Sequence, residues 1–216
     1  ENMSLITPHG AASLTPLIAT GQRLADLERE SSTLQSITVS SAAAANAVML
    51  GAGYFTPLTG YMNRADTLSV ATDLKTTDDL FWPVPVLNMV ERFDGNVGDR
   101  IALRDPNVDG ARVIAVMDVT GIECLSDDDM ALMTREVFGT DDPKHPGVAT
   151  FNSQGQVLLS GPIEVLNFSY FQSDFPGTFR TATEIREEIE SRGWTRVVAF
   201  QTRNPMHRAH EELCRM

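Results

Sequence analysis

The sequence has few of the residues that characterise disulfide-rich, metal-clustered or membrane-spanning proteins. Only two of its 216 residues are cysteines, Cys124 and Cys214, and no Cys-x-x-Cys pair is present. We therefore expect reduced thiols and a cytoplasmic protein, with Cys214 as a small buried residue. The longest apolar stretch, 42–50, is interrupted by Asn46 and is much shorter than the roughly 20 residues of a membrane span. We expect no membrane insertion, and the N-terminus shows no secretory signal pattern.

Basic residues are also scarce, and this bears on the choice of ligand. The formal net charge is −12, and only two residues are lysines, Lys75 and Lys144. A partner with a phosphate backbone needs a basic face, so we expect no binding of nucleic acid. Residues 196–216 carry four arginines against two glutamates, a net charge of +2, which leaves −14 on the rest of the chain. This local positive charge favours a small anion as the ligand.

The first 170 or so residues show a mixed helix and strand pattern. We expect a helix over 21–30, a strand over 36–40 and an alanine-rich helix over 41–50 that is closed by Gly51. Asp-Gly steps at 94–95 and 109–110 predict turns between antiparallel strands. The expected strands of this part are 84–90, 100–104, 111–119, 157–159 and 163–168.

A helix is predicted over residues 127–138. Ser126 suits the N-cap, the three aspartates 127–129 suit the positive first turn, and Gly139 suits the end. Pairing with the helix dipole explains the aspartates without a cation. The sequence His145-Pro146-Gly147 is interpreted as a structural turn.

The composition changes at residues 173–183, where we place a boundary between domain 1–172 and domain 173–216. Thr181 and Glu184 form a predicted capping box, and the helix continues to Ser191. A buried strand over 196–200 and a helix from residue 207 complete an α-β-α unit, typical of the opening of a parallel α/β sheet. Ligands of such sheets bind beyond the carboxyl ends of the strands.

Residues 201–210, Gln-Thr-Arg-Asn-Pro-Met-His-Arg-Ala-His, follow that expected strand. Two histidines at i and i+3 share one face if the segment after Pro205 is helical, so both rings reach one ligand at the positive end of the helix dipole. Gln201 and Arg203 add donors, and the guanidinium fork suits an oxyanion. A zinc site at the two histidines lacks a third ligand with suitable spacing.

This segment resembles ATP sulfurylase (sulfate adenylyltransferase), whose hallmark is Gln-x-Arg-Asn-Pro running into His-x-x-His. The resemblance extends over nearly the whole chain, because further segments agree in order: Pro8-His9-Gly10, residues 51–62, residues 81–86, residues 137–140 and residues 145–148. It implies an α+β, PUA-like β-barrel domain with helices, followed by the start of a Rossmann-like α/β nucleotidyltransferase domain.

The resemblance also implies a reaction, in which ATP and sulfate give adenylyl sulfate (APS) and pyrophosphate by in-line attack on the α-phosphate. Sulfate is already ionised, so the site must supply hydrogen-bond donors rather than a base. Mg²⁺ is expected on the triphosphate, and no metal bound by the protein is expected. Gln201 and Arg203 would bind sulfate. The implied catalytic residues are Thr202, Arg203, Asn204, His207 and His210, which would contact ATP together with Gln201.

Two departures from the family pattern matter. Ala209 stands where related nucleotidyltransferases often have glycine, and a Gly-Arg-Asp-His-type segment is not present before Met216. We therefore expect the chain alone to be an incomplete enzyme, and the complete protein to be a homo-oligomer in sulfur metabolism, such as sulfate assimilation, with the reaction direction open. Three alternatives stay open: another His-x-x-His adenylyltransferase with an organic phosphate acceptor, a PUA-like RNA-binding module, and a structural or oligomer-forming piece.

Overall fold

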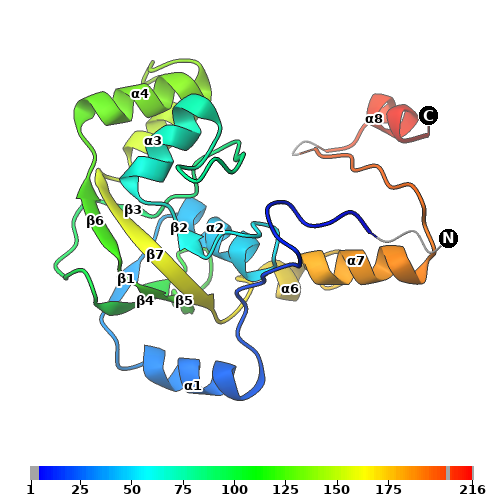
Figure 1. Ribbon diagram of the computed structural model, residues 1–216, viewed down its shortest axis with the longest axis horizontal. Coiled ribbons are helices and arrows are strands. Elements are labelled where there is room, and N and C mark those ends of the chain that lie inside the picture. The colour runs from blue at the N-terminus through cyan, green and yellow to red at the C-terminus, as the bar shows by residue number, and fades with distance from the viewer. Residues whose placement is uncertain (1–4, 203–204, 216) are drawn as a thin grey trace.

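The computed structural model describes residues 5–202 and 205–215. Figure 1 shows a body made of a curled sheet and surrounding helices, from which helix α7 (Ala182–Ser191) extends to one side. The chain then turns back and ends in α8 (Arg208–Arg215), apart from the body. None of the helices among the described residues combines the length and apolar character needed to cross a bilayer.

Seven strands form the curled sheet of the body. The main path runs in the order β1-β4-β5-β7-β2, and β3 and β6 also pair with β7. Among the named strands of the described residues, β1 and β4 pair in parallel and the other pairs are antiparallel. The strands are β1 Ser36–Thr38, β2 Gly60–Tyr61, β3 Met89–Val90, β4 Arg100–Arg104, β5 Val113–Asp118, β6 Gly121–Cys124 and β7 Val157–Val165.

Strand β7 joins the two parts of the sheet and bends in its middle. Its first half pairs with β3 and β6, and its second half pairs with β5 and β2. Gly161 lies at the change of partners with φ +145°, and a Cβ there would lie 1.9 Å from the carbonyl oxygen of Asp118. Only glycine fits this crossing, because any side chain would collide with backbone.

Helices cover the sheet, and the alanine-rich α2 is the most deeply buried of them. Ala43, Ala44, Ala47 and Val48 are fully buried in the main apolar cluster, against strands β5 and β7. Small side chains allow this close approach of helix and sheet. The helices are α1 Gly21–Ser31, α2 Ser41–Gly51, α3 Arg64–Asp73, α4 Asp127–Phe138, α5 Pro146–Asn152, α6 Phe171–Asp174, α7 Ala182–Ser191 and α8 Arg208–Arg215.

The predicted helix over 127–138 is confirmed with the predicted ends. Ser126 and Asp129 form a reciprocal capping box, and Gly139 ends α4 in the left-handed conformation with φ +71°. Asp129 also accepts two hydrogen bonds from the guanidinium of Arg64 on α3, at 2.7 and 2.9 Å. The contacts of Arg64 lower the pKa of Asp129 below its usual value. The aspartate therefore fastens α3 to α4 in addition to capping its own helix.

Several predicted strand limits were wrong. The expected strand over 84–90 is reduced to β3, because Pro83 and Pro85 cannot donate to a ladder. The turn at 94–95 was expected to join two strands that pair with each other. The strands on its two sides are β3 and β4, but β3 pairs with β7 instead. The two strands expected over 157–159 and 163–168 are one continuous strand, β7. Helix α3 and strand β6 were not predicted.

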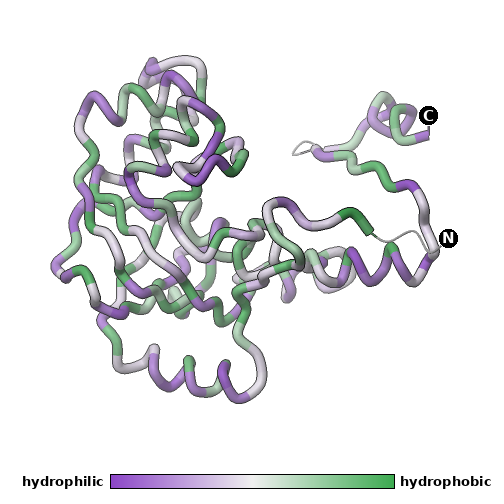
Figure 2. The backbone as a smooth tube through the Cα atoms, in the orientation of Figure 1, coloured by the Kyte–Doolittle hydropathy of each residue, from purple (hydrophilic) through white to green (hydrophobic). Residues whose placement is uncertain are grey.

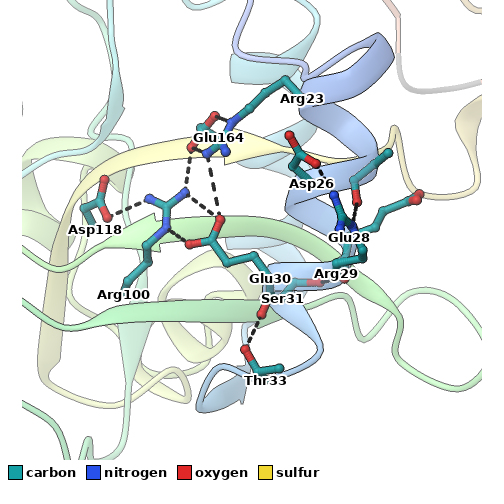
Figure 3. A network of polar contacts seen from close by, with 11 residues as sticks. Arg23, Asp26, Glu28, Arg29, Glu30, Ser31, Thr33, Arg100, Asp118 and Glu164 are labelled. Atoms are coloured by element: carbon teal, nitrogen blue, oxygen red, sulfur yellow. Dashed lines mark hydrogen bonds and ion pairs between the residues drawn. The ribbon is translucent and has the colours of Figure 1, made fainter.

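A network of charged side chains attaches α1 to the sheet (Figure 3). Arg100 of β4 contacts Glu30, Asp118 and Glu164, and Arg23 of α1 pairs with Glu164 through both of its carboxylate oxygens. Hydrogen bonds from Arg23 and then Arg100 lower the pKa of Glu164 to about 2. The carboxylate therefore links a helix and two strands.

Helix α7 begins on the body and leads to the C-terminal segment. Thr181 and Glu184 form the predicted capping box, and Ala182 donates its N–H to the carbonyl of Ala52 at 2.9 Å. Arg186 donates to the carbonyl of Ile6 at 2.8 Å. The predicted helix and its cap are confirmed, and the N-terminal segment contacts this helix through the carbonyl of Ile6.

Candidate functional site

The expected buried strand over 196–200 is not formed. Its residues lie outside any helix or strand, and Val197, Val198 and Phe200 are exposed, Val198 by 92%. Figure 2 shows this apolar run between α7 and α8. A strand in a parallel sheet needs neighbours to accept its backbone hydrogen bonds and to cover its side chains. No strand among the described residues pairs with it.

The two predicted histidines do come together. Helix α8 begins at Arg208, so His207 lies directly before it and His210 in its first turn. Their ring centroids are 3.9 Å apart, and the ring planes are inclined by 35°. Spacing i and i+3 therefore places both rings side by side at the positive end of the helix, as the sequence predicted. The helix begins at Arg208, one residue after the predicted start at residue 207.

Backbone N–H groups hold one nitrogen of each ring. Ala209 donates its N–H to Nδ1 of His207 at 3.3 Å, and His207 donates its own N–H to Nδ1 of His210 at 3.4 Å. Phe200 packs against the ring of His210, with centroids 5.6 Å apart. Sequence reasoning did not single out Phe200, although its place at the end of the apolar run was visible.

Of the other predicted site residues, the structure describes only Gln201 and Thr202. Gln201 and Thr202 are exposed and lie outside any helix or strand, directly after Phe200. Arg203 and Asn204 lie outside the described residues. The structure therefore brings together the two histidines and Phe200, and the arrangement of the predicted sulfate-binding residues around them stays a prediction.

The charges of α8 are partly neutralised within the helix. Arg215 forms ion pairs with Glu211 at 2.5 Å and with Glu212 at 3.8 Å. These glutamates are exposed, so their pairs contribute little to stability. The positive charge of Arg215 partly neutralises the two glutamates that follow His210, and this favours an anionic ligand at the helix start.

The other histidine and cysteine side chains considered in the sequence lie outside the segment 201–210. His145 accepts a hydrogen bond from the N–H of Val148 and caps α5, consistent with the structural interpretation. Cys124 and Cys214 are free and exposed, so the expectation that Cys214 is buried was wrong. Cys214 lies on the short helix α8 with its side chain exposed. No group of three or more histidine, cysteine, aspartate or glutamate side chains suited to a metal gathers within residues 5–202 and 205–215.

Two protein families match different parts of the chain. Residues 6–168 match the model of the PUA-like domain. The chain belongs to the PUA-like domain family. Residues 177–216 of this PUA-like chain match the ATP-sulfurylase family, and that match contains the whole segment from Gln201 to His210. The predicted fold class is confirmed.

Curated relatives agree with the resemblance seen in the sequence. The sulfate adenylyltransferase of Allochromatium vinosum is 61% identical over 98% of this PUA-like chain and 54% of the relative. That of Alcanivorax borkumensis is 60% identical over 99% of the chain and 54% of the relative. The chain thus spans about half the length of the curated relatives it matches. The resemblance to the N-terminal portion of ATP sulfurylase is confirmed.

A solved structure has a similar fold. The hexameric APS kinase from Thiobacillus denitrificans superposes with a TM-score of 0.73 and 25% sequence identity. The likeness covers 97% of this PUA-like chain and 36% of that longer chain. The similarity therefore includes both the curled sheet of the body and the segment that follows it.

Proposed function

We propose that this chain is the N-terminal portion of a sulfate adenylyltransferase, which joins ATP and sulfate into APS and pyrophosphate or runs the reverse reaction. The observation that carries the proposal is the segment Gln201–His210, which lies inside the ATP-sulfurylase match and sets two imidazoles at the start of a helix. The identity of about 60% to two sulfate adenylyltransferases supports it.

The chemistry of this reaction fits a site built of donors. An oxygen of sulfate forms a new bond to the α-phosphorus, while the bond from that phosphorus to pyrophosphate breaks. No proton has to be removed from sulfate, so the protein must position two anions and stabilise the charge that develops on the phosphoryl oxygens. Mg²⁺ would arrive with ATP and neutralise the triphosphate.

We propose for the site residues the roles that the resemblance to ATP sulfurylase implies, which fit this requirement. Gln201 and Arg203 hold sulfate, with the guanidinium fork setting the direction of attack. His207 and His210 donate to phosphate oxygens, aided by the N–H groups of the first turn of α8. Thr202 and Asn204 complete the contacts to the α-phosphate.

The remaining half of the complete protein is proposed to supply two things. The first is a set of neighbouring strands that covers residues 196–200, since their apolar side chains suit a buried parallel strand. The second is the rest of the nucleotide site. We place the boundary between the two domains at residue 173, where the composition changes before the cap of α7. The complete protein is proposed to form a homo-oligomer, which light scattering would test.

The proposal is tested in the complete protein by exchange of labelled pyrophosphate into ATP in the presence of APS. We expect Arg203→Ala to reduce the exchange by at least about 10²-fold, because one fixed oxyanion donor is lost. Arg203→Lys keeps the charge without the fork and should recover only part of the rate. Arg92→Ala removes an exposed arginine of the body and serves as the control. Normal turnover by Arg203→Ala would contradict the role assigned to it.

The acceptor is tested separately, because another His-x-x-His adenylyltransferase would share the phosphate contacts. Molybdate and chlorate imitate sulfate and should compete with it in the complete protein. An enzyme that adenylylates an organic phosphate would be insensitive to both. That outcome would replace sulfate as the substrate while leaving the adenylyl transfer chemistry in place.

A further inference from the structure

The two histidines stand at the positions of a capping box. The carbonyl of His207 accepts the N–H of Glu211 at 3.1 Å, which makes His207 the N-cap residue of α8. Its Nδ1 accepts the N–H of Ala209, and Nδ1 of His210, three residues later, accepts the N–H of His207. Each histidine side chain thus satisfies a backbone donor that the helix start leaves without an intrahelical partner.

A related reciprocal cap occurs at two other helices with ordinary capping residues, where the N-cap side chain accepts from the third helical residue, whereas His207 accepts from the second, Ala209. Ser126 and Asp129 form it at α4, and Thr181 and Glu184 form it at α7. A histidine also caps α5, where Nδ1 of His145 accepts the N–H of Val148 at 3.4 Å. An imidazole nitrogen therefore serves as a cap acceptor at two separate helices of this protein.

We propose that His207 and His210 form a reciprocal helix cap that fixes both imidazoles as neutral donors protonated at Nε2. A ring nitrogen that accepts a hydrogen bond carries no proton, so the single proton of each neutral ring must lie on Nε2. Phe200 lies against His210 and limits the rotation of that ring.

This arrangement deepens the proposed function and rests on it for the identity of the ligand. With both Nδ1 atoms occupied, the two Nε2–H groups are the donors left for an oxyanion, and neither ring serves as a base. The reaction needs donors and no base, so the tautomers match the chemistry. The spacing His-x-x-His then has a structural cause, because a capping box joins the N-cap residue to the third helical residue.

The tautomers can be read directly by ¹⁵N NMR of the 216-residue chain labelled at its four histidines. At about pH 8 free imidazole is neutral, so any preference for one tautomer comes from the fold. We expect widely separated resonances for His207 and His210, with Nδ1 unprotonated and Nε2 protonated. His145 should give the same pattern and serves as an internal reference.

Paired substitutions test whether the cap is the cause. His207→Asn keeps a good N-cap, whereas His207→Ala removes it, and the ring of His210 is observed in both. We expect His210 to keep its tautomer in the first variant and to become a mixture of tautomers in the second. His210→Gln and His210→Ala give the reciprocal pair, with His207 observed.

Several outcomes would overturn the proposal. It fails if either ring of the unchanged chain is protonated at Nδ1 or is a free mixture of tautomers, or if the cap-keeping and cap-removing variants give equal spectra. The measurement needs no substrate and is therefore independent of the proposed reaction. Locked tautomers in a complete protein that makes no APS would refute the proposed function alone.

Discussion

The body of the protein and its C-terminal segment, residues 192–202 and 205–215, differ in how their apolar side chains are covered. In the body, the apolar residues of β4, β5 and β7 are buried between the sheet and its helices. The C-terminal segment leaves its apolar side chains exposed, namely Trp194, Val197, Val198, Phe200, Met206 and Leu213. The proposed site residues that the structure describes, among them His207 and His210, lie in this uncovered segment.

The difference teaches that the body supplies most of the stability of this chain, whereas the proposed reactive residues lie in the C-terminal segment. A buried core resists unfolding because its burial removes apolar surface from water, whereas the exposed segment gains almost nothing from its own apolar residues. What orders the start of α8 is local, namely the hydrogen bonds between His207, Ala209 and His210. Changes in the two regions should therefore appear in different measurements.

The largest effect on folding is expected from the core of the body. Ile101 of β4 is fully buried, so Ile101→Ala should lower the free energy of unfolding by about 2–5 kcal/mol, through lost burial and the cavity left behind. Val198 is exposed, so Val198→Ala should change it by less than about 0.5 kcal/mol. Denaturant unfolding of the 216-residue chain measures both values. Similar losses in the two variants would show that the segment is as well packed as the body.

For activity, in contrast to stability, the larger effect is expected from a change in the C-terminal segment. His207→Ala in the complete protein should reduce APS formation by about 10²-fold, since one phosphate donor is lost. In the 216-residue chain the same change should leave the unfolding transition of the body unchanged. A loss of body stability equal to that of Ile101→Ala would mean that His207 supports the fold of the whole chain.

The separation also explains which parts of the fold were predictable. Helix α4 was predicted to the residue because its signals are local, with Ser126 at the start and Gly139 at the end. Strand β7 was predicted as two strands, on either side of Gly161 and Pro162, two residue types that commonly mark a turn. In the structure this pair lies at a crossing, where β7 changes partners from β3 and β6 to β5 and β2. Such a crossing depends on strands far away in the sequence.

The site was predictable to a similar degree. The spacing of His207 and His210 predicted their approach, because residues three apart on a helix lie on one face. The cap they form was missed, since the familiar capping pattern has serine or threonine followed by glutamate or glutamine. The strand over 196–200 was predicted from its apolar run, but apolar composition does not supply the neighbouring strands that the pairing requires.

Removal of the N-cap should have a smaller effect on stability, and this effect should differ between α4 and α7, which have the same kind of cap. Ser126→Ala removes the cap of α4, which packs against α3 and α5, so the free energy of unfolding should fall by about 1 kcal/mol. Thr181→Ala removes the cap of α7, whose only buried residue among those described is Ala182. We expect that change to increase hydrogen exchange within α7 while the unfolding transition of the body stays in place. Equal shifts of the global transition would show that α7 unfolds together with the body.

The smallest effect concerns acid stability at the network of Arg23, Arg100 and Glu164. The two arginines hold the pKa of Glu164 at about 2, below the usual glutamate value of about 4.3. A lowered pKa in the folded state adds stability that is complete above the unfolded value and is lost as the pH falls from about 4.3 toward 2.

Because the carboxylate of Glu164 is partly exposed, Glu164→Gln should cost less than about 1 kcal/mol at neutral pH. The difference between the two proteins should shrink as the pH falls toward 2, since Glu164 itself becomes neutral there. Unfolding measured between pH 7 and pH 2.5 tests this, with Glu136→Gln on α4 as the control for loss of an exposed carboxylate. A constant difference over the whole range would mean that Glu164 contributes through packing rather than through its charge, and that α1 is attached to the sheet mainly by its apolar face.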